Sequence, residues 1–126
     1  MQSRLIASLS AGILGLTLAA TNASAHHGWA GQGTEAFTVK GTVQTALSLS
    51  GPHATMRIKD AKGQTWDLTL APPPRTQRAG LEEGIIPVGA EVTILGKRNL
   101  DPKRFEVKTE RVTYNGKNYD VYPDRL

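Results

Sequence analysis

Cysteine is absent from the 126-residue sequence. The chain therefore forms no disulfide, and its fold must be held by its hydrophobic core. Thiolate is also excluded as a metal ligand, so any metal site has to use imidazole, amine, carboxylate or thioether groups. Histidine is scarce as well, with three residues in the chain. The positions of these three restrict where a nitrogen-rich metal site can form.

Aromatic residues and net charge are both limited. Two tryptophans, three tyrosines and two phenylalanines make up the aromatic residues. They are too few for a core together with the broad aromatic surface on which enzymes hold polysaccharides. The 15 basic residues exceed the 11 acidic ones slightly, for a net charge of +4. Because this excess is mild and dispersed along the chain, the composition argues against nucleic acid as a partner.

The one long apolar run lies at the start of the sequence. Arg4 precedes the apolar stretch 5–20, and residues 23–25 read Ala-Ser-Ala. A basic start, an apolar stretch and small residues before a cleavage point are typical of a secretory signal peptide. We therefore predict that residues 1–25 direct export to the periplasm or beyond the cell, with cleavage after Ala25. No later run approaches the ~20 apolar residues of a membrane-spanning helix, so no membrane span is expected after cleavage.

The remaining residues divide into an arm and a β-rich domain. Residues 26–36 are rich in glycine and are predicted to form a flexible N-terminal arm, whereas residues 37–126 form the domain. From Phe37 onward, apolar and polar residues alternate with the period of a half-buried strand, and Gly41 within this stretch indicates a bulge or sharp bend. The strands expected from alternation and turn residues cover 37–44, 53–60, 66–70, 90–97, 104–113 and 118–122. Hairpin turns are expected at residues 60–63 and at Asn115-Gly116.

A short helix is expected between the third and fourth of these strands. Three consecutive prolines at 72–74 end the third strand, and residues 75–83 favour a short helix with Gly84 near its end. Three strands, a helical connection and two more strands follow the order of the OB-fold, a small five-stranded barrel. We therefore predict an all-β, five- to six-stranded OB-like barrel. Another small barrel or a sandwich with the same strand count is the alternative.

The histidines occupy two places in the chain. Cleavage after Ala25 would make His26 the N-terminal residue, whose α-amine and imidazole together close a chelate ring on a metal ion. His27 follows directly, and His53 stands at the start of the second expected strand. Copper(II) prefers a square-planar set of nitrogen and oxygen ligands. His26 with a third nitrogen from His53 would complete a T-shaped histidine brace, and His27 is the competing third ligand.

This copper hypothesis competes with a simpler interpretation of the same residues. A His-His pair beside a cleavage point is also compatible with a solvated N-terminus, and a histidine after a proline often bonds a backbone group in a turn. In a simple hairpin, His53 lies near the end of the first strand and not near its start. An extended arm of residues 26–36 spans ~36–40 Å and could fold back. We assign Met56 and Trp66 to the core, because Met56 points opposite to His53 on a regular strand.

Three functional classes remain open. The first is a periplasmic metal-binding protein, with copper as the metal and another periplasmic protein as a partner, acting as carrier, buffer or accessory. The second is a binding module for an envelope glycan or a small anion, since OB-folds bind such ligands on the face of their second and third strands. The exposed positions expected on that face are Thr55, Arg57, Gln64 and Thr65. The third is a copper-dependent oxidative enzyme, which the small number of aromatic residues disfavours.

Several segments resemble a family of small exported bacterial proteins of unknown function. The segments that carry the resemblance are Ala-His-His-Gly-Trp at 25–29, Phe-Thr-Val-Lys-Gly-Thr-Val at 37–43, Gly-Pro-His-Ala at 51–54, Pro-Val-Gly-Ala-Glu-Val at 87–92, and Gly96. Together they cover nearly the whole mature chain.

The histidine placement is the most specific part of this resemblance. Members of that family typically begin the mature chain with Ala-His-His-Ser-Phe and carry Asn-Pro-His-Val at the second strand. This chain differs at residues 28–29 and at Gly51, and neither change removes a nitrogen ligand. The resemblance implies that His26, His27 and His53 are distinctive polar positions, and it implies no activity.

Overall fold

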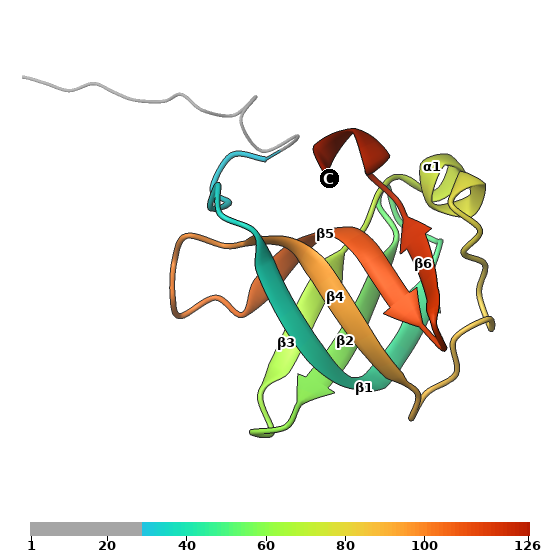
Figure 1. Ribbon diagram of the computed structural model, residues 1–126, viewed down its shortest axis with the longest axis horizontal. Helices are drawn as coiled ribbons and strands as arrows, with labels where there is room; N and C mark the ends of the chain where they lie inside the picture. The colour runs from blue at the N-terminus through green and yellow to red at the C-terminus, as the bar shows by residue number, and fades with distance from the viewer. Residues whose placement is uncertain (1–28) are drawn as a thin grey trace, which may run out of the picture. The chain divides into compact units, whose positions relative to one another are not determined.

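Six β-strands, one α-helix and a C-terminal 3-10 turn follow one another from Phe37 to the end of the chain (Figure 1). They are β1 (Phe37–Ser48), β2 (Thr55–Asp60), β3 (Thr65–Thr69), α1 (Pro73–Arg78), β4 (Glu91–Arg98), β5 (Glu106–Tyr114), β6 (Lys117–Asp120) and η2 (Pro123–Arg125). The structure is a computed structural model that describes residues 29–126, of which Gly31–Leu126 form one unit. The predicted signal peptide, His26 and His27 lie outside the described residues.

The strands form a closed barrel. They pair in the order β3-β2-β1-β4-β5-β6, and each of these pairings is antiparallel. In addition, β3 pairs with β5 in parallel, with Asp67 opposite Glu106 and Thr69 opposite Lys108. This pairing closes five strands into a barrel and leaves β6 as an extra strand on β5. The predicted all-β, OB-like barrel is therefore confirmed, including a helix between the third and fourth strands.

Alternation along the strands places the apolar side chains inside the barrel. In β2, Met56 and Ile58 are buried, whereas Thr55 and Arg57 are exposed. Trp66 of β3 is also buried, so the assignment of Met56 and Trp66 to the core is confirmed. The other strands complete the interior with Val39, Val43, Val92, Ile94, Val107 and Val112. Burial of this apolar surface supplies the stabilisation that a domain without cysteine needs.

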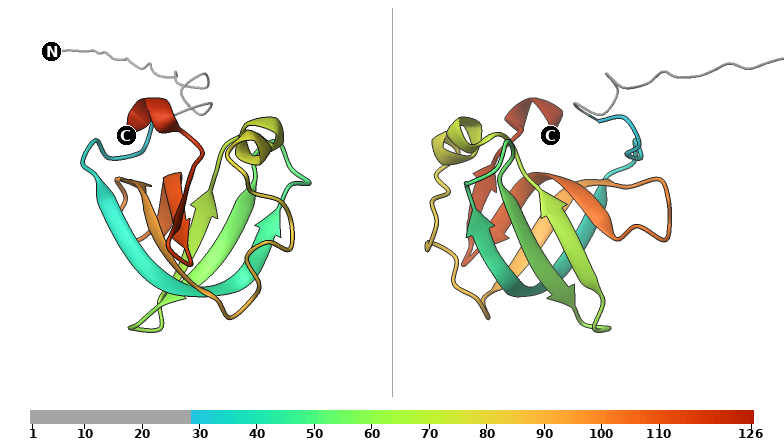
Figure 2. Two further views of the ribbon diagram at one scale, coloured as in Figure 1. Left: turned by 45° about the vertical axis from the view of Figure 1, so that its right-hand side comes forward. Right: turned by 180° about the vertical axis from the view of Figure 1, so that it is seen from behind.

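β1 is long enough to pair with two different strands. Its first half pairs with β4 from Phe37 to Thr42, and its second half pairs with β2 from Gly41 to Ser48. At Gly41 an added Cβ would lie 2.6 Å from the carbonyl oxygen of Lys59, so no side chain fits there. The register with β2 is regular through Gly41, and the irregularities of this pairing lie later, between Val43 and Ser48, so the bulge considered for Gly41 falls further along β1. β1 curves, and both of its ends lie on the upper side of the barrel in Figure 2 (left), the side that also carries α1 and η2.

The two hairpin turns predicted from the sequence are also present. Asn115 and Gly116 connect β5 to β6 with φ angles of 53° and 80°, the left-handed conformation that a two-residue hairpin turn requires. Between β2 and β3, the Asp60 carboxylate accepts hydrogen bonds from the amides of Lys62 at 2.9 Å and Gln64 at 3.0 Å. Polar turn residues therefore set the register of both hairpins.

The helix begins earlier and ends earlier than the predicted range of 75–83. It comprises Pro73–Arg78, with prolines in its first turn. Proline fits there because the first N–H groups of a helix have no partner within the helix, so the residues that end β3 also start α1. Gly80, with a φ of 102°, follows the helix end in place of Gly84. No helix within residues 29–126 is long and apolar enough to cross a membrane.

Candidate functional site

His53 lies in the connection between β1 and β2, two residues before β2 begins at Thr55. The prediction that His53 is the first residue of this strand is wrong. The pairing of β2 with β1 ends where Ser48 lies opposite Thr55, so the strand does not extend back to His53. The next residue, Ala54, is fully buried, and its amide donates a hydrogen bond to the carbonyl oxygen of Ala71 at 2.9 Å. This bond fixes the connection to the chain after β3 and holds His53 half-buried.

The environment of His53 favours its neutral form. Burial is the main cause that lowers the pKa of His53 below its ordinary value of 6.5, and the positive charge of Lys108 lowers it further. The imidazole forms no hydrogen bond and no ion pair with any residue that the structure describes. A neutral imidazole in this state has a nitrogen lone pair available for a metal ion.

Lys108 is an electrostatic neighbour of His53 that the sequence did not reveal. It stands opposite Lys97 of β4 and is 6% exposed. Burial and the charge of Arg125 lower the pKa of its ammonium group. Its Nζ lies 5.6 Å from the centroid of the Tyr122 ring. The sequence shows Lys108 only as a lysine within a predicted strand, which does not indicate that it acts on His53.

Further cations surround Tyr122. The guanidinium carbon of Arg75 lies 4.8 Å from the Tyr122 ring centroid, and Arg75 Nη2 lies 3.2 Å from Asp124 Oδ1. We call Arg75, Lys108 and Arg125 the cationic cluster. Lys108 is the member of this cluster whose charge acts on His53.

The described residues do not form a complete metal site. Within residues 29–126, no group of three or more His, Cys, Asp or Glu is placed to hold a metal ion. Of the three predicted ligands the structure places His53, and it brings no second one to it, since His26 and His27 lie outside the described residues. Among the described residues, His53 is therefore the one member of the predicted ligand set whose surroundings the structure shows.

The polar face of β2 and β3, the candidate surface for a glycan or an anion, is largely bonded within itself. Arg57 Nε lies 2.7 Å from Asp67 Oδ1. Gln64 Nε2 donates to the carbonyl oxygen of Thr65 at 2.9 Å, and the Thr65 hydroxyl donates to Gln44 Oε1 at 3.1 Å. The structure thus places Arg57 on the expected face, but an acidic partner already occupies its guanidinium.

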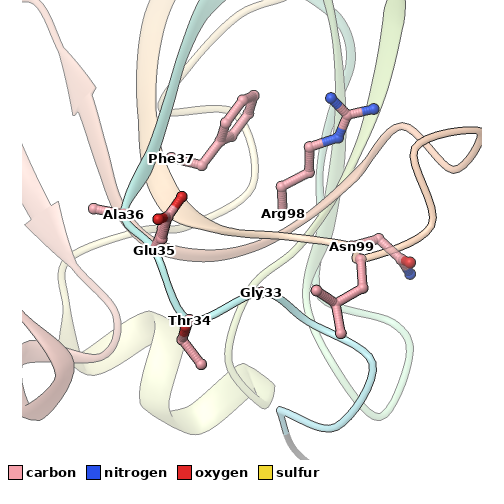
Figure 3. A pocket seen from close by; sticks show the side chains of 8 residues that line it. Gly33, Thr34, Glu35, Ala36, Phe37, Arg98 and Asn99 are labelled. Carbon is pink, nitrogen blue, oxygen red and sulfur yellow. The ribbon is translucent and has the colours of Figure 1, made fainter.

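A cavity of about 400 Å³ lies where the chain joins the barrel (Figure 3). The amide of Gly33 donates a hydrogen bond to the carbonyl oxygen of Arg98 at 2.7 Å. The amide of Leu100 donates a hydrogen bond to the carbonyl oxygen of Gly31 at 2.9 Å. These bonds fix the segment before β1 to the end of β4. The described part of the predicted arm from Gly31 onward is therefore hydrogen-bonded to the barrel and lines this cavity together with Phe37.

Comparisons with known proteins give a family and one solved structure of limited similarity. A search of curated proteins finds no match. Among solved structures, the crystal structure of the ZRD-deleted mutant of TiaS in complex with agmatine is similar, with a TM-score of 0.48 and 14% identity. The similarity covers 68% of this chain and 26% of that one, so this chain spans about a quarter of its length. The model of a family of unknown function (DUF6152) matches residues 14–108, and the chain belongs to this family.

Proposed function

We propose that the protein binds copper in the periplasm as a carrier, buffer or accessory. His26 and His53 are its ligands, with His27 as the competing third ligand. The observation that carries the proposal is the state of His53, a half-buried imidazole with a lowered pKa and no hydrogen bond to any described residue. Metal binding displaces protons from its ligands, so an imidazole that is already neutral near pH 7 binds at lower cost.

The curvature of β1 and the short spacing in the sequence support the proposal. A straight first strand would put its start and its end at opposite ends of the barrel. Because β1 curves, both of its ends lie on the upper side of the barrel (Figure 2, left). His26 lies five residues before Gly31, a stretch that reaches at most ~18 Å when extended.

The type of donor supports copper as the metal. An amine and imidazoles are nitrogen donors, which suit Cu(II). Among the divalent first-row metals, Cu(II) binds to such donors with the highest affinity. Thiolate, which would favour zinc or Cu(I), is absent because the chain has no cysteine.

The placement of the aromatic residues supports binding over catalysis. Within residues 29–126, Trp66, Tyr119 and Tyr122 are buried and the other aromatic side chains are half-buried. This arrangement favours a binding role over polymer oxidation, which uses a broad, exposed aromatic surface. We assign to the site the capture and release of copper, and no oxidation of a substrate.

The proposal is tested by titrating Cu(II) into protein that has been exported and processed so that His26 is its first residue. We expect one tight equivalent, with nitrogen hyperfine structure in the electron paramagnetic resonance spectrum. Replacing His53 by Gln, or adding one glycine before His26, should weaken binding at least about tenfold, since even outer-shell partners of a metal ligand contribute 10–100-fold.

The controls separate the two halves of the site. Arg57→Gln changes an exposed residue of β2 without removing an imidazole and should bind copper as the unchanged protein does. If the glycine-extended protein binds equally tightly, the amine is not a ligand. If His53→Gln binds equally tightly, the barrel takes no part in the site and the proposal fails.

A further inference from the structure

Arg98 ends β4 on the face of the strand that points into the barrel. Alternate residues of β4 are buried up to Gly96, and Arg98 continues the alternation. Its guanidinium carbon lies 4.8 Å from the ring centroid of Trp66 and 5.1 Å from that of Phe105. The two rings meet edge to face with centroids 5.2 Å apart. The cation is therefore held against a pair of packed aromatic rings.

The charge of Arg98 is not neutralised by a carboxylate within residues 29–126. Its Nη2 donates a hydrogen bond to the carbonyl oxygen of Pro102 at 2.9 Å, and its Nε is buried without an acceptor. A guanidinium has five N–H donors, and a charge in an apolar environment without a counter-ion is costly. Arg98 thus retains both charge and donors for a ligand.

A second cavity, of about 390 Å³, opens beside this guanidinium. It lies between the β2–β3 turn and the β4–β5 loop, and its lining includes Asp60, Lys62, Gln64, Trp66, Arg98 and Phe105. The volume falls within the range of small-molecule sites. The two rings give this cavity an apolar wall, and Lys62 and Arg98 give it two positive charges.

Asp60 is the one acidic residue of this lining, and its carboxylate is already occupied. It accepts hydrogen bonds from Trp66 Nε1 at 2.9 Å and from the amides of Lys62 and Gln64. The bond from Trp66, followed by that from Gln64, lowers the pKa of Asp60 and keeps its carboxylate ionised. Two cations and one anion leave the lining with one net positive charge.

The cavity in Figure 3 also touches Arg98 but has a different charge balance. Glu35 is part of its lining, so one acidic and one basic side chain offset each other there. Of the two cavities that share Arg98, the one that contains Lys62 is therefore the better site for an anion.

We propose that Arg98 and Lys62 bind a small monocarboxylate with a flat apolar body in the cavity between the β2–β3 turn and the β4–β5 loop. The planar guanidinium matches the two oxygens of a carboxylate, and the apolar body packs against Trp66 and Phe105. A monoanion matches the single net positive charge of the lining, which a phosphate dianion would exceed. His53 is not part of this lining, so the site is independent of the copper proposal.

Benzoate is the probe for this site, added to the 15N-labelled mature chain and followed by NMR. The Nε–H signal of Arg98 and the Nε1–H signal of Trp66 should shift together and saturate. Benzamide, which has the same ring without the charge, should shift neither to a comparable extent. Equal shifts with the two compounds, or tighter binding of inorganic phosphate than of benzoate, would overturn the proposal.

Variants locate the anion within the barrel. Lys62→Gln alters an exposed turn residue without touching the packed rings, and it should weaken benzoate binding severalfold. Arg98→Lys keeps the charge but removes the planar guanidinium that can donate two parallel hydrogen bonds to a carboxylate. It should weaken binding about tenfold. Lys59→Gln, also exposed on β2, is the matched control and should bind benzoate unchanged. If all three bind equally, or if the shifts centre on Glu35 in the neighbouring cavity, the proposed site is wrong.

Discussion

Lys108 is a buried ammonium group whose charge reaches His53. Burial is the main reason that the pKa of His53 lies below 6.5, and Lys108 adds to the effect. Burial and Arg125 in turn lower the pKa of Lys108 itself. A substitution that removes the charge of Lys108 while filling the same space should therefore change the imidazole and preserve the barrel.

Lys108→Met should raise the pKa of His53 part of the way back toward 6.5. The methionine keeps most of the apolar stem and removes the charge, so burial alone continues to lower the pKa. NMR titration of the His53 ring protons, assigned with His53→Gln, measures the change. Lys59→Met removes an exposed lysine of β2 and should leave this pKa unchanged. A His53 pKa that does not move in Lys108→Met would assign the whole shift to burial.

Two lysine–glutamate pairs connect neighbouring strands of the barrel in contrasting environments. Between β4 and β5, Lys97 Nζ lies 2.9 Å from Glu110 Oε2, and the side chains are 17% and 2% exposed. Between β1 and β4, Lys40 Nζ lies 3.7 Å from Glu91 Oε1, with side chains 65% and 70% exposed. Water compensates the loss of one partner at the surface, but it cannot do so in the interior.

Glu110→Gln should lower the free energy of unfolding by about 3–5 kcal/mol, because it leaves the ammonium group of Lys97 in the interior without its partner. Glu91→Gln should cost less than about 1 kcal/mol. Urea unfolding followed by circular dichroism measures both values. Similar costs for the two variants would contradict the buried environment of the first pair.

Local signals in the sequence explain which elements could be predicted. Alternation from Phe37 and the turn at 115–116 depend on neighbouring residues, and both predictions are confirmed. The continuation of β1 to Ser48 is not visible in the alternation, because pairing with β2 extends the strand. The start of α1 at Pro73 was missed because prolines that end a strand also fit the first turn of a helix.

The surroundings of the candidate site could be predicted only in part. His53 stands out because histidine is rare in this chain. Its electrostatic neighbour Lys108 is distant in the sequence and comes near through the parallel pairing of β3 with β5, which no local pattern indicates. The rings around Arg98 likewise come from β3 and from the loop before β5, so their convergence depends on closure of the barrel.

The stability of the whole molecule should rise from acid to neutral pH. The pKa of Asp60 is lowered from 3.8 and that of His53 from 6.5. Between the folded and the ordinary pKa of each group, the unfolded chain binds more protons than the folded one, so stability increases with pH there. The contribution of each group is complete above its ordinary pKa and is lost as the pH falls through the folded value.

His53→Gln should therefore flatten the stability profile just below about pH 6.5, while Asp60→Asn should flatten its acidic end. Urea midpoints of both variants and of the unchanged protein, measured across this range, test the assignment. A profile of His53→Gln that coincides with that of the unchanged protein below pH 6.5 would show that other groups cause the dependence.

The strand order divides the barrel into two meanders, β1-β2-β3 and β4-β5-β6, in which each strand pairs with its neighbour in the sequence. The two seams that join them, β1 with β4 and β3 with β5, bring together distant parts of the chain. Neither meander can bury its apolar face alone, so the core forms when both seams close. The entropy of closing the intervening loop is therefore lost before the contacts of the core stabilise the fold. The chain should consequently fold more slowly than a helical protein of its length, in one all-or-none step, with the α1 connection as the tether between its halves.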